Sequence, residues 1–182
     1  MRPSRSRRRA LYAVAAYALV AIATSACGRD GEPQTPEVGA PAPAFAAITT
    51  TGDSVTLASL RGRVVLLNVW ATWCQPCLEE IPQLIALHDA YAPRGLSVVG
   101  VSIDAAGMGG DVSDFATVHG MRYPLWLDPD QRVSVQFLMR GVPETILLDR
   151  AGIIRARVIG ALRPGDSTLT RSIERSLQES AP

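Results

Sequence analysis

Residues 70–82 read WATWCQPCLEEIP and carry the strongest structural signal in the chain. An apolar run over residues 64–70, VVLLNVW, leads into two cysteines, Cys74 and Cys77, that are separated by two residues. A helix-like pattern follows them. A strand that feeds a helix with Cys-x-x-Cys in its first turn is typical of a reactive, reversible dithiol. Because a helix N-terminus presents unpaired N–H groups and the positive end of the helix dipole, we expect a thiolate at Cys74 to be stabilised there.

The first 27 residues have the pattern of a targeting segment. Arginines cluster over residues 2–9, an apolar run follows over residues 10–23, and small residues lead to Cys27. The apolar run is shorter than the about 20 residues that a membrane-spanning helix needs. Residues 24–27, TSAC, resemble a lipoprotein lipobox, so we expect a lipoprotein signal with Cys27 as the lipidation site. An uncleaved signal anchor and soluble secretion are the alternatives, and all three place the rest of the chain outside the cytoplasm.

The chain that follows this segment is mildly acidic. All 17 acidic residues and 13 of the 18 arginines lie from Cys27 onward, and the chain has no lysine, so this part carries a net charge of −4. This balance gives no reason to propose nucleic-acid binding. About 155 residues are enough for one domain with a sizeable core.

Residues 28–44 are rich in glycine, proline and glutamate, and they have little apolar content. We therefore expect a flexible tether there, followed by one folded domain over residues 45–182. This domain should open with a β-hairpin whose strands cover residues 45–49 and 54–57.

The remaining pattern alternates strands and helices. Predicted strands cover residues 64–70, 96–103, 123–127, 146–148 and 153–159, and predicted helices cover residues 76–91, 111–119, 132–138 and 164–178. Pro82 lies inside the first helix and is expected to kink it. This order predicts a three-layer α/β fold with a mixed central sheet flanked by helices, whose last two strands form a hairpin.

Three motifs make the chain resemble the thioredoxin superfamily, and within it the membrane-tethered, extracytoplasmic TlpA/ResA-like thiol-disulfide oxidoreductases. The motifs are WCQPC over residues 73–77, EEIP over residues 79–82 and GVPET over residues 141–145. The resemblance extends from Val38 to Leu177. It implies a thioredoxin-like fold, in which residues 104–127 are the insertion that this subgroup carries between its central strands.

The resemblance also implies how the dithiol works. Cys74, at the exposed start of the helix, is expected to attack a substrate disulfide and form a mixed disulfide. Cys77, nearly one helical turn further in, is expected to resolve it. This leaves a redox-active Cys74–Cys77 disulfide, and no other cofactor or metal is expected. Pro143 is carried over as the family's cis-proline beside the dithiol. Val142 is expected to offer backbone groups to an extended substrate, and Trp73 to flank the site.

Two acidic residues near these motifs are further candidates. Glu80 lies three residues after Cys77 and therefore shares its helix face. A carboxylate there would raise thiol pKa values and could pass protons during exchange, and related proteins carry an acidic residue at the matching position. Glu79 is interpreted as a solvated charge. Glu144, next to Pro143, is a candidate for substrate binding.

Three uncharged residues are expected to tune the dithiol: Asn68, Gln75 and Pro76. Asn68 interrupts the apolar run of residues 64–70. It is either a satisfied structural amide or a polar group placed beneath the dithiol, and the sequence favours neither.

Other functions for the two thiols are less well supported. A zinc site is not expected, because there is no second cysteine pair and only His88 and His119 are available. A purely structural disulfide across so short a loop would constrain little. A thiol peroxidase is the nearest alternative enzyme, but its nucleophile usually follows Pro-x-x-x-Thr-x-x-Cys, and Leu67 and Ala71 stand at those positions. A copper chaperone for oxidase assembly, with Met139 or His119 as a further ligand, is the non-enzymatic alternative.

The expected function is therefore a reductase of protein disulfides that an N-terminal anchor holds at the membrane, outside the cytoplasm. The resemblance implies oxidised proteins with cysteine pairs as clients, with apocytochrome c in cytochrome c maturation as the implied pathway. It also implies a transmembrane thiol-reducing electron donor. We expect a monomer that binds no nucleic acid.

Overall fold

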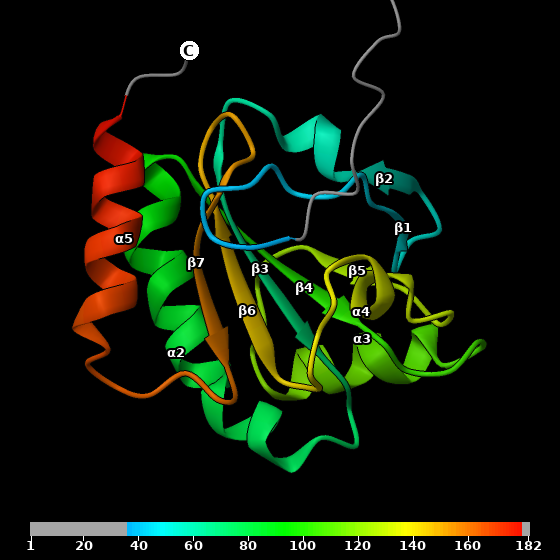
Figure 1. Ribbon diagram of the computed structural model, residues 1–182. Helices are drawn as coiled ribbons and strands as arrows, with labels where there is room; N and C mark the ends of the chain where they lie inside the picture. Colours follow the sequence, from blue (N-terminus) through cyan, green and yellow to red (C-terminus); the bar gives the residue numbers. More distant parts are fainter. Residues whose placement is uncertain (1–35, 180–182) are drawn as a thin grey trace, which may run out of the picture. The chain divides into compact units, whose positions relative to one another are not determined.

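The sheet is built outward from β3 (Val64–Trp70), the apolar strand that precedes the dithiol. All seven residues of β3 are buried, because it lies between the parallel strand β4 (Leu96–Ser102) and the antiparallel strand β6 (Glu144–Leu148). The computed structural model describes residues 36–179 and orders the strands β2-β1-β5-β4-β3-β6-β7 (Figure 1). The predicted mixed sheet is confirmed. The predicted targeting segment and its lipidation site, Cys27, lie outside the described residues.

The remaining strands extend the sheet on both sides. β5 (Leu125–Leu127) pairs parallel with β4 and antiparallel with β1 (Ala46–Thr49). The predicted N-terminal hairpin is confirmed, because β1 pairs antiparallel with β2 (Ser54–Thr56). On the other side, β7 (Ile154–Ile159) pairs antiparallel with β6, which confirms the predicted terminal hairpin.

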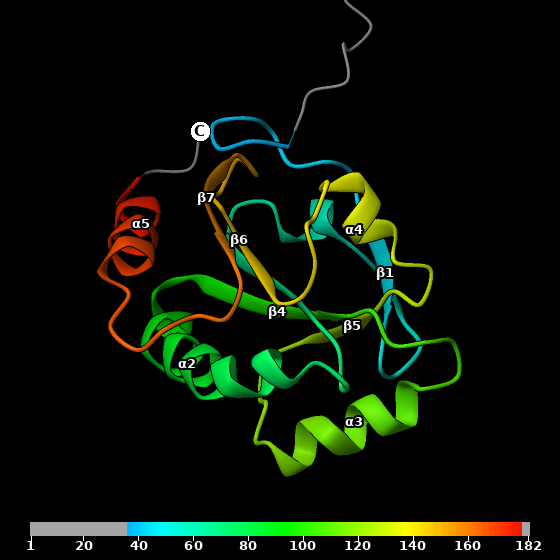
Figure 2. The ribbon, with the colours of Figure 1, turned by 60° about the horizontal axis from the view of Figure 1, so that its bottom comes forward.

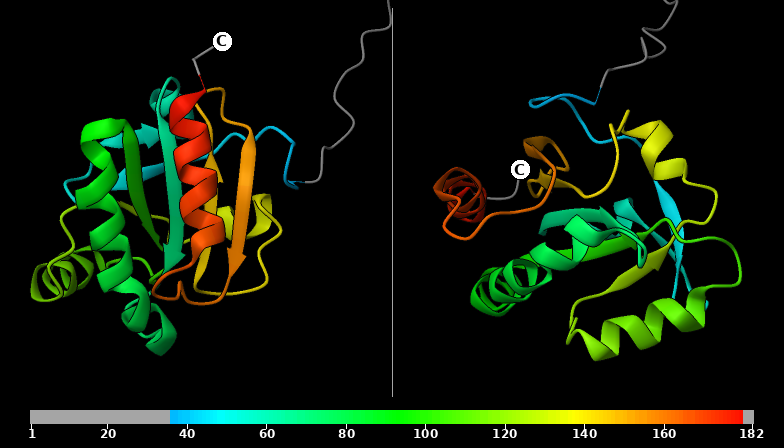
Figure 3. Two further views of the ribbon diagram at one scale, coloured as in Figure 1. Left: turned by 90° about the vertical axis from the view of Figure 1, so that its left-hand side faces the viewer. Right: turned by 90° about the horizontal axis from the view of Figure 1, so that it is seen from below.

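Three α-helices cover one face of the sheet and one covers the opposite face (Figures 2 and 3). The first face carries α2 (Gln75–Tyr91), α3 (Gly109–Val118) and α5 (Ser167–Gln178). The opposite face carries α4 (Arg132–Gln136) and the segment of residues 36–44. Short 3-10 helices, η2 (Leu57–Leu60) and η3 (Ala92–Arg94), follow β2 and α2.

The ends of the helices follow from local sequence. α5 begins three residues later than predicted, because the Asp166 carboxylate accepts the backbone N–H groups of Thr168 (2.9 Å) and Leu169 (3.1 Å) and so caps the helix. α2 continues through Pro82, and Figure 1 shows that the helix changes direction in the part nearer its N-terminus. A proline inside a helix removes one backbone hydrogen bond, which is the usual cause of such a bend.

The folded domain begins before residue 45. The backbone N–H of Gly39 donates to the carbonyl oxygen of Ile154 (2.8 Å). The N–H of Ala42 donates to the carbonyl oxygen of Gly152 (2.9 Å). The prediction that residues 28–44 form a tether is therefore wrong for their last part, which pairs with the start of β7. Composition marks a proline-rich segment as extended, but it does not reveal that an edge of the sheet is open to receive it.

A buried ion pair between Glu144 and Arg157 holds the loop that precedes β6. The fully buried Glu144 carboxylate accepts from Arg157 Nε with one oxygen and from the Arg140 backbone N–H (3.1 Å) with the other. The Arg157 guanidinium also donates to the carbonyl oxygens of Phe137 (2.7 Å) and Pro36 (3.1 Å). Arg157 therefore joins β7 to the loop after α4 and to the N-terminal segment.

Replacing Arg157 should destabilise the fold severely. Arg157→Met leaves the Glu144 carboxylate buried without a counter-charge, and we expect the free energy of unfolding to fall by about 3 to 5 kcal/mol. Arg122→Met is the control. Arg122 pairs with Asp89 at 2.7 Å, and both side chains are largely exposed (66% and 51%), so its loss should cost about 1 kcal/mol or less. Urea unfolding followed by tryptophan fluorescence measures both, and equal losses would contradict the assignment.

Candidate active site

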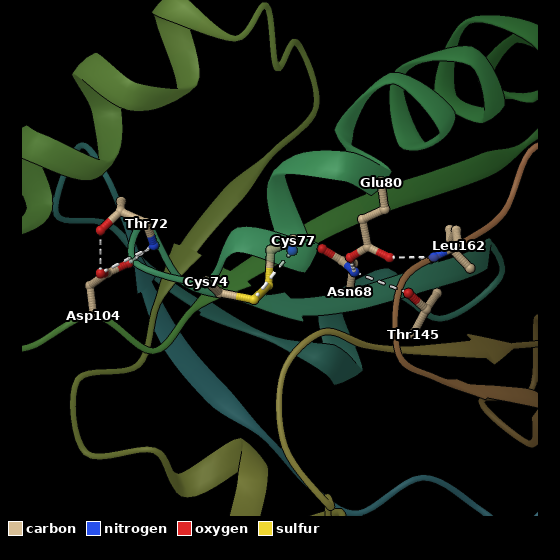
Figure 4. Close-up of a disulfide and its surroundings, with 8 residues drawn as sticks. All are labelled: Asn68, Thr72, Cys74, Cys77, Glu80, Asp104, Thr145 and Leu162. Carbon is tan, nitrogen blue, oxygen red and sulfur yellow. Dashed lines mark hydrogen bonds between the residues drawn. A yellow bond between two sulfur atoms is a disulfide. The ribbon is translucent and has the colours of Figure 1, made fainter.

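Cys74 and Cys77 are joined in a disulfide at the start of α2 (Figure 4). Their sulfur atoms are 2.02 Å apart and their Cα atoms 5.3 Å apart. Cys74 is the N-cap residue of the helix, and its Sγ accepts from the backbone N–H of Cys77 (3.3 Å). A thiolate released at Cys74 would meet the same N–H and the positive end of the helix dipole. The predicted order of strand, dithiol and helix is confirmed.

Access to the disulfide is narrow. Cys74 is only 4% exposed, so it is less open than its position at the start of the helix led us to expect, and Cys77 is 2% exposed. The reason is that the Cys74 sulfur is turned inward to bond the buried Cys77. The neighbouring Trp73 is 66% exposed, and Gln75 and Pro76 are exposed as well. A substrate that reaches the disulfide from solvent would meet these three side chains.

Asp104 fixes the turn that precedes the dithiol, and the sequence analysis assigned it no role. Its nearly buried carboxylate accepts from the backbone N–H (3.1 Å) and the hydroxyl (2.6 Å) of Thr72. It also accepts from the Ser102 hydroxyl (2.7 Å). Because β3 and β4 are parallel, their carboxyl ends meet at one edge of the sheet, which brings these residues together. The sequence contains both strands, but the pairing depends on their register.

Glu80 lies one turn beyond Cys77, on the buried face of α2 (Figure 4). One carboxylate oxygen accepts from Asn68 Nδ2 (2.7 Å) and the other from the backbone N–H of Leu162 (2.8 Å). Burial raises the pKa of Glu80 from 4.5 to about 7, although these two hydrogen bonds act in the opposite direction. A carboxyl group with this pKa can both accept and release a proton near neutral pH.

Asn68 connects Glu80 to strand β6. Its Nδ2 donates to Glu80 and also to the hydroxyl oxygen of Thr145 (3.0 Å), which lies directly opposite Asn68 in the antiparallel register. All three side chains are buried. Of the two interpretations that the sequence allowed, this geometry favours a polar group placed beneath the dithiol helix.

Val142 and Pro143 lie close to the end of β3. The peptide bond between them is cis, as the resemblance implied. Val69 pairs with Glu144 in the antiparallel register, so Pro143 lies beside the end of β3, from which the chain continues to the dithiol. The carbonyl oxygen of Pro143 accepts from the Gly160 N–H (2.9 Å), and Val142 is partly exposed.

Glu144 does not face the dithiol. Successive residues of a strand point to opposite faces, so Glu144 points away from α2 while Thr145 points towards Glu80. The Glu144 side chain is fully buried, and both of its oxygens are occupied by Arg157 and Arg140. The Glu144 side chain therefore has a structural role, and its surroundings lend no support to the predicted part in substrate binding. The sequence shows that Glu144 follows Pro143 but not which face it takes.

Residues 36–179 contain neither a metal-binding cluster nor a membrane-spanning helix. No group of three or more His, Cys, Asp or Glu side chains there could hold a metal ion. None of the described helices is both long enough and apolar enough to cross a membrane.

Removing the Glu80 charge should stabilise the protein progressively as the pH rises from 4.5 to above 7. The folded-state pKa of about 7 lies above the ordinary value of 4.5, so the folded state loses stability as the pH rises through this window. Relative to wild type, Glu80→Gln should gain nothing below pH 4.5 and about 3 kcal/mol above pH 7. Urea unfolding of the oxidised protein across this range measures the difference. Glu79→Gln, on the exposed side of the helix, is the control, and a gain for Glu80→Gln that does not vary with pH would contradict the prediction.

Known proteins match most of the described chain. Residues 38–157 match the AhpC/TSA family. The thiol-disulfide oxidoreductase ResA of Geobacillus kaustophilus is 30% identical over 145 residues, which are 80% of this chain and 79% of that protein. The thioredoxin-like protein YneN of Bacillus subtilis is 33% identical over 125 residues, which are 68% of this chain and 72% of that protein.

A solved structure agrees with these matches. A crystal structure from Chlorobium tepidum, described as a thiol:disulfide interchange protein DsbE, has a TM-score of 0.71 and 32% sequence identity. The match covers 78% of this chain and 98% of that one. Together with the disulfide at the start of α2, these similarities show that the chain belongs to the AhpC/TSA family of thioredoxin-like proteins and is a thiol-disulfide oxidoreductase of the ResA/DsbE type.

Proposed function

We propose that the protein is a membrane-tethered reductase of protein disulfides that works outside the cytoplasm. The observation that carries the direction of electron flow is the buried Glu80 carboxyl, one helical turn from Cys77. A carboxylate beside a dithiol disfavours thiolates. Dithiols become strong oxidants when their reduced form is stabilised, so a site that withholds this stabilisation favours reduction of its partners.

The proposed reaction is a two-step exchange. The Cys74 thiolate attacks one sulfur of a client disulfide. This breaks the client S–S bond, forms a mixed disulfide and releases the other client sulfur as a thiolate, which takes up a proton. Cys77 then loses its thiol proton to Glu80 and attacks the Cys74 sulfur. This step breaks the mixed disulfide, forms the Cys74–Cys77 disulfide and releases the second client sulfur as a thiolate, which takes up a proton. The client gains two electrons and two protons, and the enzyme ends in the oxidised state that the structure shows.

The client surface is proposed to include the exposed side chains around the disulfide and the backbone of Val142. Trp73, just before α2, and Gln75 and Pro76, in its first turn, are accessible, and Val142 is partly exposed beside the end of β3. These groups supply an aromatic face and free backbone groups, which suit an extended polypeptide.

The proposed location rests on the N-terminal sequence, and the proposed partners rest on the family resemblance. The arginine-rich start, the apolar run and Cys27 support a lipoprotein at the outer side of the membrane. Apocytochrome c is the proposed client, because haem attachment needs its cysteine pair in the reduced state. A transmembrane thiol carrier is the proposed electron donor, since the oxidised enzyme must be reduced again before each turnover.

The redox potential tests the direction of the reaction. Equilibration with a dithiothreitol or glutathione couple should give a value near that of thioredoxin, about −270 mV. A value near −120 mV would make the protein an oxidant. Peroxide turnover and copper titration run in parallel test the two alternatives, and fast turnover or tight stoichiometric copper binding would contradict the proposal.

The order of attack predicts which variant traps a client. Cys77→Ser removes the resolving thiol, so mixed disulfides through Cys74 should accumulate in the cell envelope and be visible as bands that disappear on reduction. Cys74→Ser is the matched control and should trap none. Mass spectrometry of the bands identifies the client. Trapping by Cys74→Ser alone would reverse the assigned roles.

A further inference from the structure

The Asn68 side chain has an unused hydrogen-bonding group directly beneath the dithiol helix. Its Nδ2 donates to Glu80 Oε1 (2.7 Å) and to Thr145 Oγ1 (3.0 Å), so both hydrogens are occupied (Figure 4). Its Oδ1 is buried and has no partner among the described residues. A buried acceptor without a donor is unfavourable. An unpartnered acceptor next to a titrating carboxyl group points to a second arrangement that uses it.

Leu162 determines which oxygen of Glu80 carries the proton. The backbone N–H of Leu162 donates to Glu80 Oε2 (2.8 Å) and can act only as a donor. Neither this N–H nor the Asn68 Nδ2 group can accept the acid hydrogen of protonated Glu80. The Leu162 N–H belongs to the backbone, whereas the Asn68 amide can turn, so the hydrogen is expected on Oε1, which faces Asn68. In the observed orientation both groups that bond the carboxyl are donors, so this hydrogen has no acceptor among them.

A half-turn of the Asn68 amide removes this conflict. Oδ1 then takes the position of Nδ2 and can accept from the protonated Glu80. The Thr145 hydroxyl can donate as well as accept, so it follows the amide by turning its own hydrogen towards Oδ1. The same side chain can thus offer Glu80 a donor when the carboxyl group is ionised and an acceptor when it is protonated, without any movement of the backbone. The Nδ2 group then takes the place in which Oδ1 has no partner in the observed orientation.

We propose that Asn68 and Thr145 are positioning residues for Glu80, and that the Asn68 amide reverses its orientation each time Glu80 gains or loses a proton. This inference rests on the proposed acid–base role of Glu80. In the resolving step the proton leaves the Cys77 thiol and bonds to Glu80 Oε1, and it later leaves Oε1 as the released client thiolate is protonated. The electrons stay with the sulfur atoms, and neither Asn68 nor Thr145 forms or breaks a covalent bond.

Few other ionisable groups face Glu80. The thiols of Cys74 and Cys77 lie on the same helix, and Tyr123 approaches from the segment before β5; burial and the nearby Glu80 carboxylate raise the pKa of Tyr123 above its ordinary value. The residues of β3, β4, β6 and β7 on this face carry no charge. Arg163, next to Leu162, is exposed. In the oxidised protein the thiols do not titrate, so Glu80 can be followed alone.

The reversal can be tested in the oxidised full-length protein by nuclear magnetic resonance between pH 5 and 9. The carboxyl carbon of Glu80 should titrate, and the side-chain amide signals of Asn68 should move with the same midpoint. Nuclear Overhauser contacts from the amide hydrogens to Thr145 should be strong above this midpoint and lost below it. Constant Asn68 signals alongside a titrating Glu80 would overturn this inference alone. A Glu80 carboxyl that does not titrate in this range would overturn both it and the proposed acid–base role.

Asn68→Leu should change the pH dependence of the reaction. The carboxylate loses one of its two donors, so the Glu80 midpoint should rise by about one to two pH units. The ionised fraction at pH 7 then falls, and release of client from the mixed disulfide should slow by about five- to fiftyfold at pH 7 but approach the wild-type rate at higher pH. Stopped-flow measurements of this step give the profile.

Two further comparisons separate this effect from a loss of packing. Ser97→Ala removes a buried polar side chain from β4 on the opposite face of the sheet, and it should leave the midpoint unchanged. Thr145→Ser keeps the hydroxyl and should preserve the Asn68 contacts that Thr145→Val loses. A slowing of Asn68→Leu that is equal at every pH would contradict the proposal. The wild-type titration decides the question even if Asn68→Leu does not fold.

Discussion

The hydrogen bond from Asn68 to Glu80 connects the centre of the sheet to the helix that carries the dithiol, and the active site depends on it. A carboxyl group enters a protein interior at a large cost unless donors are placed to receive it. Here one donor comes from the middle of β3 and the other from the backbone of Leu162, between β7 and α5. This fully buried strand therefore does more than fill the core, since it carries the amide that makes an internal carboxyl group tolerable beside Cys77.

Strand β6 serves both faces of the sheet with two consecutive polar residues. Thr145 points to the dithiol side and supports Asn68, whereas Glu144 points to the other side and binds Arg157. Arg157 in turn fastens the loop that leads to Val142 and Pro143. The two faces thus have separate tasks: one holds a group whose charge changes during exchange, and the other holds a fixed pair of charges that keeps the neighbouring loop in place.

The sequence was sufficient to predict the order of the strands and helices, because apolar runs, turn residues and the Cys-x-x-Cys motif are local signals. It also supported a role for Glu80 at the dithiol, since a spacing of three residues places Glu80 and Cys77 on the same face of a helix. It could not decide the position of Glu144, the contact between Asp104 and Thr72, or the partner of Asn68. These depend on strand register, which brings together residues far apart in the chain. The exposure of Cys74 was overestimated for a related reason, because the sequence does not show how the turn at residues 71–74 orients its sulfur.

The pairing of residues 39–42 with the start of β7 has a consequence for handling the protein. An uncovered edge strand is a template on which another chain can add a strand. Here the template is occupied by a segment of the same chain, in which Pro41 and Pro43 lack the N–H groups that would recruit a further strand. A shortened protein that begins at residue 45 would keep every predicted strand and the whole dithiol site, yet it would expose this edge. Such a protein is expected to self-associate through β7, so preparations meant to stay monomeric need the proline-rich segment as part of the domain.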